Sequence, residues 1–176
     1  MNKLNNKRRK ESRERIENTL ITLLQNQELS KISVTEICTH AEVNRTTFYA
    51  NYLDIYDLAE AVQERLLNEV LSLYQEEIEQ QQGNHDFLRL FYHIKENPLH
   101  YKTYFKLNAG GKLPFIKYSI AEATELFGNQ HMDYHIAFFA NGLNAVIQKW
   151  LENDCKESPE EILTIIQAEY QERVKR

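Results

Sequence analysis

The sequence predicts an all-α protein, and three observations support that fold class. Glycine and proline are scarce, at 5 and 3 of 176 residues. Long stretches repeat apolar residues every three or four positions, which is the period of an amphipathic helix. Short polar breaks with Gly, Pro, Asn or Asp separate these stretches. We expect an N-terminal three-helix domain over residues 1–57 and a helical body over residues 58–176.

Composition also bounds where the protein works. The two cysteines, Cys38 and Cys155, are too few for a disulfide framework, so we expect reduced thiols and a cytoplasmic protein. No stretch approaches the roughly 18 uninterrupted apolar residues of a membrane-spanning helix. The polar N-terminus lacks a signal-peptide core. We therefore expect no membrane association.

The first helix is predicted from about residue 10 to residue 27. Its buried face carries Ile16, Leu20, Leu23 and Leu24. Residues 28–32 then form a loop, in which Leu29 and Ile32 are expected to cover a small core.

The stretch from Ser33 to Asp57 holds two short helices joined by a tight turn. Ser33 and Glu36 form a capping box at the start of the first helix, and Asn44 is a suitable N-cap for the second. The first helix has one buried stripe, made of Val34, Ile37, Cys38 and Ala41, whereas Phe48 and Tyr52 share one side of the second helix. Because the second helix is rich in hydrogen-bonding side chains, the pattern is typical of a DNA-binding helix-turn-helix.

The run VTEICTHAEVNRTTFYANYLDIYDL resembles the N-terminal domain of the TetR family of bacterial transcriptional regulators. The positions that match the family pattern in identity or type are Thr35, Ile37, Val43, Thr47, Phe48, Tyr49, Tyr52, Asp57 and Leu58. Three positions depart from it. Glu42 replaces the usual Gly, so the turn must accommodate a non-Gly residue, with a positive φ as one option. Asn51 replaces a His, and Ile55 replaces a Lys that touches a phosphate in many members.

The resemblance implies which side chains contact DNA. The predicted set is Thr35, Asn44, Arg45, Thr46, Thr47, Tyr49, Asn51 and Tyr52. Arg45 suits a guanine edge and Thr46 a thymine methyl, whereas Tyr49 suits phosphate oxygens. Thr47 is alternatively a cap or backbone anchor. The competing interpretation is that Tyr49 packs against the first helix and Arg45 is merely solvated.

The N-terminal end is strongly basic. Residues 1–15 carry seven Lys or Arg against two Glu, whereas the whole chain has a net charge of −5. A basic end on an acidic body orients the molecule toward phosphates. A solvated, disordered tail is the alternative. Beside a helix-turn-helix, we expect a DNA-backbone or minor-groove arm made of Lys7, Arg8, Arg9 and Lys10.

The body is predicted to consist of successive helices. Asp54 can cap a long connecting helix that continues to about Gln82. The helices expected beyond it span residues 86–95, 98–108, 114–127 and 132–153, followed by a last one that begins at Ser158-Pro159-Glu160-Glu161.

The last two helices offer more apolar surface than one small body needs. The segment Ala137–Gln167 also resembles the closing segment of one TetR subgroup, and family members usually dimerise there. The predicted interface comprises Phe138, Gly142, Ala145, Val146, Trp150, Ile162, Ile165, Ile166 and Tyr170. The alternative is that this face packs on the chain's own core. A two-fold four-helix interface would give the homodimer that a palindromic site requires.

A small-molecule effector site is a further expectation from the family. Its candidate lining is Tyr92, His93, Tyr101, Tyr104, Phe105, Tyr118, Tyr134, His135 and Asn141. An aromatic stripe at helical spacing is more often plain core, and that interpretation stays open.

Enzyme motifs are missing from the sequence. It contains no nucleophile elbow, phosphate-cradling glycine loop or paired-acid motif, and nothing completes a zinc site around His131 and His135. We expect no catalysis, no metal and no cofactor. The leading hypothesis is a homodimeric repressor that binds double-stranded DNA at a near-palindromic operator. The alternatives are an activator, a family member that binds a ligand or protein without reading DNA, and a helical adaptor.

Overall fold

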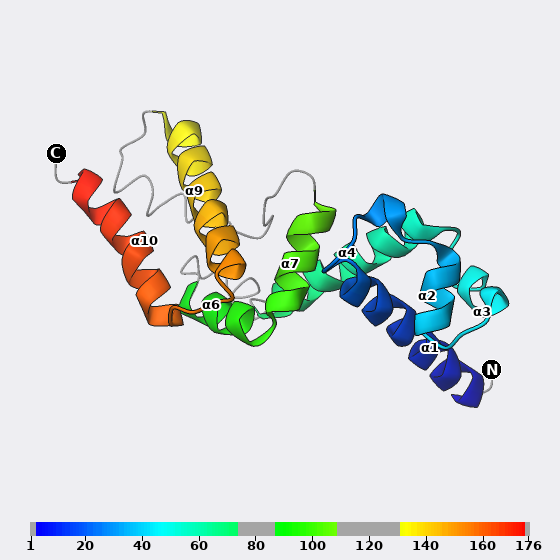
Figure 1. Cartoon of the computed structure of the whole chain (residues 1–176). Coiled ribbons are helices and arrows are strands. Elements are labelled where there is room, and N and C mark those ends of the chain that lie inside the picture. Colours follow the sequence, from blue (N-terminus) through cyan, green and yellow to red (C-terminus); the bar gives the residue numbers. More distant parts are fainter. Residues whose placement is uncertain (1–2, 74–86, 109–130, 175–176) are drawn as a thin grey trace.

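The computed structural model describes residues 3–73, 87–108 and 131–174. Within those ranges the regular structure is helical and no strand occurs. Figure 1 shows an elongated molecule with α1, α2 and α3 at one end and α6, α9 and α10 at the other. The predicted all-α fold is confirmed. The helix predicted over residues 114–127, the far end of the connecting helix and Tyr118 lie outside the described residues.

The N-terminal end of the molecule, here called the head, is built from three helices and one short turn of 3₁₀ helix. These are α1 (Lys3–Leu23), the turn Leu29–Lys31, α2 (Val34–His40) and α3 (Arg45–Tyr49). The core of the head contains Ile16, Leu20, Leu24, Ile32, Ile37, Cys38, Ala41, Phe48 and Tyr52. The predicted buried stripe of the first short helix is inside this core except for Val34, which is partly buried.

Local hydrogen bonds explain why the short helices of the head begin where they do. The Ser33 hydroxyl accepts from the Glu36 backbone N–H at 3.1 Å, and the Asn44 side chain accepts from the Thr47 N–H at 2.7 Å. Each bond satisfies an amide that has no partner within its helix. Glu42, in the turn between α2 and α3, has a φ of 52°. The N-caps Ser33 and Asn44 and the positive φ are therefore confirmed, whereas the Glu36 carboxylate accepts from Gln27 Nε2 at 2.8 Å.

Helix α4 (Ile55–Leu73) leads from the head to the body. The Asp54 carboxylate caps it by accepting from the backbone N–H groups of Tyr56 and Asp57 at 2.8 and 2.9 Å. Its buried side chains are Leu58, Ala59, Val62, Leu66 and Val70. Because α4 packs on α1 of the head and on α6 and α7 of the body, it joins the two parts.

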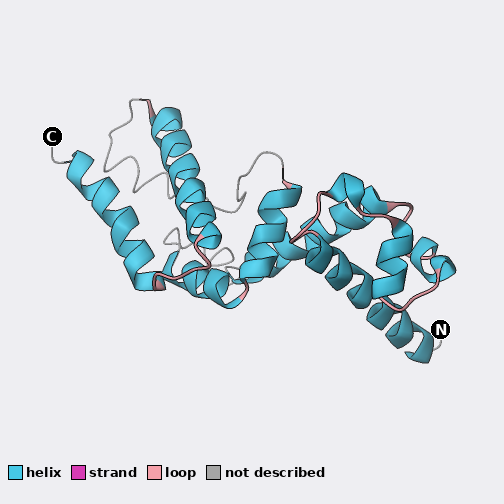
Figure 2. Ribbon diagram, in the orientation of Figure 1, coloured by secondary structure: helices cyan, strands magenta, loops and turns pink. Residues whose placement is uncertain are grey.

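The body contains α6 (Phe87–Glu96), α7 (Pro98–Leu107), α9 (Met132–Glu152) and α10 (Pro159–Val174). Helix α6 packs on α10 and α7, and α7 packs on α9 as well as α4. Figure 2 shows that short loops join the helices where the chain is described without a break. Ser158 and Glu161 form a reciprocal capping box, with bonds of 3.2 and 2.7 Å, at the predicted start of α10.

Candidate DNA-binding surface

Helix α3 lies at the outer end of the head, and one of its sides faces solvent (Figure 1). Phe48 is fully buried and anchors the helix, and its ring packs edge-on against Tyr49 with centroids 5.4 Å apart. Arg45 and Thr46 are exposed, and 56% of Tyr49 is exposed. The structure therefore gathers these three predicted DNA-contacting side chains on one accessible helix.

Arg45 is linked to the preceding helix. Its guanidinium donates to the hydroxyl of Thr35, which lies in the first turn of α2. Both residues are exposed, so this bond places a cation at the junction of the two helices without burying it. Such a cation is available to a phosphate or to the acceptor edge of a guanine.

Three other predicted residues have structural partners. Asn44 uses its side chain to cap α3, and Thr47 supplies the amide that this cap satisfies. The Asn51 amide donates to the Thr47 carbonyl at 2.8 Å, which closes the C-terminal end of the same helix. The side chains of Asn44 and Asn51 therefore hold α3 in place, and Thr47 takes part through its backbone.

Tyr52 does not belong to the exposed surface on which it was predicted. Only 3% of the residue is exposed, and its hydroxyl donates to Glu17 at 2.6 Å. It lies four residues after Phe48, so both rings face the core of the head, with centroids 5.8 Å apart. Tyr52 therefore lies on the buried side of α3.

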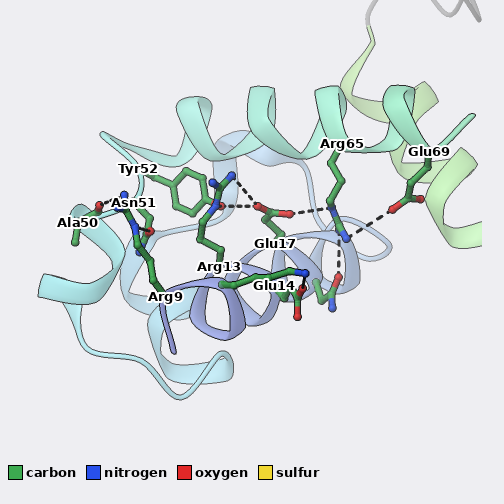
Figure 3. A network of polar contacts seen from close by, with 11 residues as sticks. Arg9, Arg13, Glu14, Glu17, Ala50, Asn51, Tyr52, Arg65 and Glu69 are labelled. Atoms are coloured by element: carbon green, nitrogen blue, oxygen red, sulfur yellow. Dashed lines mark hydrogen bonds and ion pairs between the residues drawn. The ribbon is translucent and has the colours of Figure 1, made fainter. Parts of the chain in front are cut away.

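The residues of the predicted N-terminal arm are helical. Lys7, Arg8, Arg9 and Lys10 lie within α1, which begins seven residues earlier than the sequence predicted, and all four are exposed. Figure 3 shows Arg9 reaching the end of α3. Its Nε donates to Asn51 Oδ1 at 3.1 Å and its Nη2 donates to the Ala50 carbonyl at 3.3 Å. The basic end of α1 is therefore attached beside α3.

Sequence reasoning missed Glu17, which is buried in the head and joins Tyr52 to Arg65 of α4. Its spacing contained a clue, because Glu17 precedes Leu20 by three residues and Leu24 by seven. A carboxylate on an otherwise apolar stripe indicates a charge that enters the core with a partner.

The predicted effector-site residues are not brought together in the described part of the body. Tyr92, Tyr134 and Asn141 are exposed, whereas Phe105 and His135 are partly buried. His93, Tyr101 and Tyr104 do meet, with 2.8 Å between His93 Nδ1 and the Tyr101 hydroxyl. They line a cavity of about 10 Å³, which is the space of roughly one water molecule. The plain-core interpretation suits these three residues.

The predicted interface residues differ in their exposure to solvent. Phe138, Gly142, Ala145 and Ile165 are exposed, and nothing lies within 4 Å of a Cβ built on Gly142. Val146 and Ile166 are partly buried. The side chain of Tyr170 is not among those that the structure describes. Trp150 and Ile162 belong to the core of the body, so they cannot face a partner. Trp150 packs on Phe91, with centroids 6.1 Å apart, and donates to the Glu157 carbonyl at 3.2 Å.

Residues 3–73, 87–108 and 131–174 contain neither a membrane-spanning helix nor a cluster of metal-binding side chains. No helix there is both long and apolar enough to span a bilayer. Nor do three or more His, Cys, Asp or Glu side chains gather there in a way that would hold a metal ion. His131, one of the pair considered for zinc, is the residue before α9 and has a φ of 58°.

The fold and this surface define the class of helix-turn-helix transcriptional regulators with a helical C-terminal body. A family model described as the C-terminal region of TetR-type transcriptional regulators matches residues 81–169, about half of the chain. The chain therefore belongs to the TetR family of transcriptional regulators. This match lies outside residues 34–58, which carried the first resemblance, and it includes Ala137–Gln167, which carried the second, so the family prediction is confirmed. No curated protein matched the chain.

Proposed function

We propose that this regulator binds double-stranded DNA through the exposed side of α3, with Arg45, Thr46 and Tyr49 at the centre of the contact. The supporting observation is that Phe48 is buried while these three side chains remain accessible. A short helix fixed from behind and polar in front is the form that enters a major groove. Thr35, the caps of α3 and the basic residues 7–10 add contacts to flanking phosphates.

The DNA-binding form is a homodimer assembled through α9 and α10. Tyr134, Phe138, Gly142 and Ala145 are exposed and recur along α9 at intervals of three or four residues, so they share one side of that helix. Ile165 adds exposed apolar surface on α10, and the bare backbone at Gly142 permits close approach of a partner helix. Two copies related by a two-fold axis would read a near-palindromic operator.

The regulator acts in the cytoplasm as a repressor, without catalysis, and a small-molecule effector held by the body releases it from the operator. An activator would use the same DNA contacts. A family member that binds a ligand or protein without reading DNA is the second candidate, because Ile55 is partly buried where many members present a Lys to a phosphate.

Selection of bound sequences from a random duplex library tests binding, symmetry and spacing together. The expected result is an enriched near-palindrome with half-sites about one helical turn, roughly 34–36 Å, apart. Affinity for it should fall steeply between two salt concentrations, because several phosphates are contacted. Enrichment of a single unpaired half-site would contradict the homodimer, and no enrichment at all would contradict DNA reading.

A further inference from the structure

Glu17 is a charged side chain in the interior of the head. The residue is only 4% exposed, although it follows Arg15, an exposed residue of α1, by two positions. A carboxylate removed from water is costly unless its oxygens are paired, and an apolar residue at such a site is often at least as stable. Its contacts therefore point to a task other than stability.

The two oxygens of Glu17 contact different elements of the head, as Figure 3 shows. Oε1 accepts from the Tyr52 hydroxyl at 2.6 Å and from Arg13 Nη2 at 3.5 Å. Oε2 forms an ion pair with Arg65 Nε of α4 at 2.8 Å. A single carboxylate thus ties α1 to α4 and to the segment directly after α3.

Tyr52 connects Glu17 to α3. Its ring packs on Phe48, the buried anchor of α3, and its backbone N–H donates to the Phe48 carbonyl at 2.9 Å. Burial and then the hydrogen bond to Glu17 raise the pKa of Tyr52 far above its ordinary value. The hydroxyl consequently stays neutral and remains a donor, which fixes its direction toward the carboxylate.

The same group of contacts extends toward the body. Arg65 Nη1 lies 3.8 Å from Glu69 Oε1, and Glu69 Oε2 lies 3.0 Å from His100 Nδ1 on α7. Through Arg65 and Glu69 of α4, Glu17 is therefore linked to α7. Through Tyr52, it is also linked to α3.

We propose that Glu17 is a positioning residue for DNA reading: through the Tyr52 hydroxyl and Arg65 it sets the orientation of α3 relative to α1 and α4. The inference rests on the proposed DNA-binding function. Glu17 and Tyr52 touch no DNA in this account. They determine whether the exposed side chains of α3 meet the correct base pairs.

The test compares full-length wild type with Tyr52→Phe, which keeps the ring and removes only the hydroxyl. Glu17→Gln is the second variant, and Tyr104→Phe is the matched control, because Tyr104 is equally buried but lies in the body. The measured quantity is the ratio of affinities for the selected operator and for the same duplex with one half-site scrambled. This ratio does not depend on the fraction of the protein that is folded. If Glu17 and Tyr52 only stabilised the fold, their substitution would lower the folded fraction and leave the ratio unchanged.

Tyr52→Phe and Glu17→Gln should lower the ratio by about tenfold or more, on the scale of one lost hydrogen bond to a charged group. Tyr104→Phe should leave it unchanged. The slope of log affinity against log salt should change by less than about one, because phosphate contacts remain. If Glu17→Gln does not fold, Tyr52→Phe decides, since Phe fills nearly the same volume.

The inference is overturned if wild type discriminates between the two duplexes and Tyr52→Phe discriminates equally well, whatever its thermal stability. A wild type that shows no discrimination overturns the proposed function, and the positioning role with it. The two failures are therefore distinguishable before the variants are compared.

Discussion

The head and the body of this regulator are specified by different kinds of interaction. In the head, residues a few positions apart decide the structure: Ser33 caps α2, Asn44 caps α3, and the turn passes through a positive φ at Glu42. In the body, Phe138 and Trp150 lie on the same helix, yet 63% of Phe138 is exposed and 1% of Trp150.

The helix period explains that contrast within the body. Twelve residues at 3.6 per turn place Phe138 and Trp150 about 120° apart around the axis of α9. Both sides are apolar, and the helices that pack on α9, among them α7 and, through Phe91, α6, decide which side is covered. Short-range rules therefore specify the head, whereas packing between distant segments specifies the body.

The largest expected effect separates the two apolar sides of α9. Trp150→Ala should reduce the free energy of unfolding by about 3–5 kcal/mol, because it empties a packed core site. Phe138→Ala should reduce the free energy of unfolding of the monomer much less, because 63% of Phe138 is exposed. It should instead weaken self-association. Urea denaturation and sedimentation equilibrium measure the two quantities, and an unchanged association constant for Phe138→Ala would remove this residue from the interface.

The cap of α3 tests the local rule in the head. Asn44→Ala should cost about 1 kcal/mol of stability, since the Thr47 amide loses its acceptor. Asn44→Ser is the control, because serine caps about as well without adding charge. Thermal unfolding of both variants provides the comparison. Equal stability of the Ala and Ser variants would mean that the cap contributes nothing.

A substitution in the turn between α2 and α3 should change the stability in the opposite direction. Glu42→Gly should raise stability by up to about 1 kcal/mol, because a left-handed conformation strains a side chain that bears a Cβ but not glycine. Glu60→Gly, in the exposed part of helix α4, should instead cost about 1 kcal/mol. A destabilised Glu42→Gly would show that the glutamate makes a contact that offsets its backbone strain.

The smallest expected effect is a pH dependence in the body. Burial lowers the pKa of His93 below its ordinary 6.5, so the folded state favours the neutral ring while the unfolded chain takes up the proton. The contribution of His93 is complete above pH 6.5 and is lost as the pH falls below it. His93→Gln should therefore flatten the decline in stability between about pH 7.5 and 5.5. Identical pH profiles for wild type and His93→Gln would refute the assignment.

Sequence alone predicted the helical class, the family and the caps, because each depends on residues close together in the chain. It did not predict that Tyr52 turns inward to Glu17, since that contact joins residues 35 positions apart. It placed Trp150 at an interface because periodicity shows that a side of a helix is apolar but not what covers it. The helical start of α1 was missed because a run of basic residues is compatible with both a tail and a solvated helix.

A base-pair substitution scan of the selected operator, performed with wild type and with Arg45→Ala, tests most directly whether α3 reads DNA. The account predicts that Arg45→Ala loses about 1–3 kcal/mol of binding and its preference at one base pair of each half-site, while the other preferences persist. Substitution profiles that are the same for both proteins would contradict it.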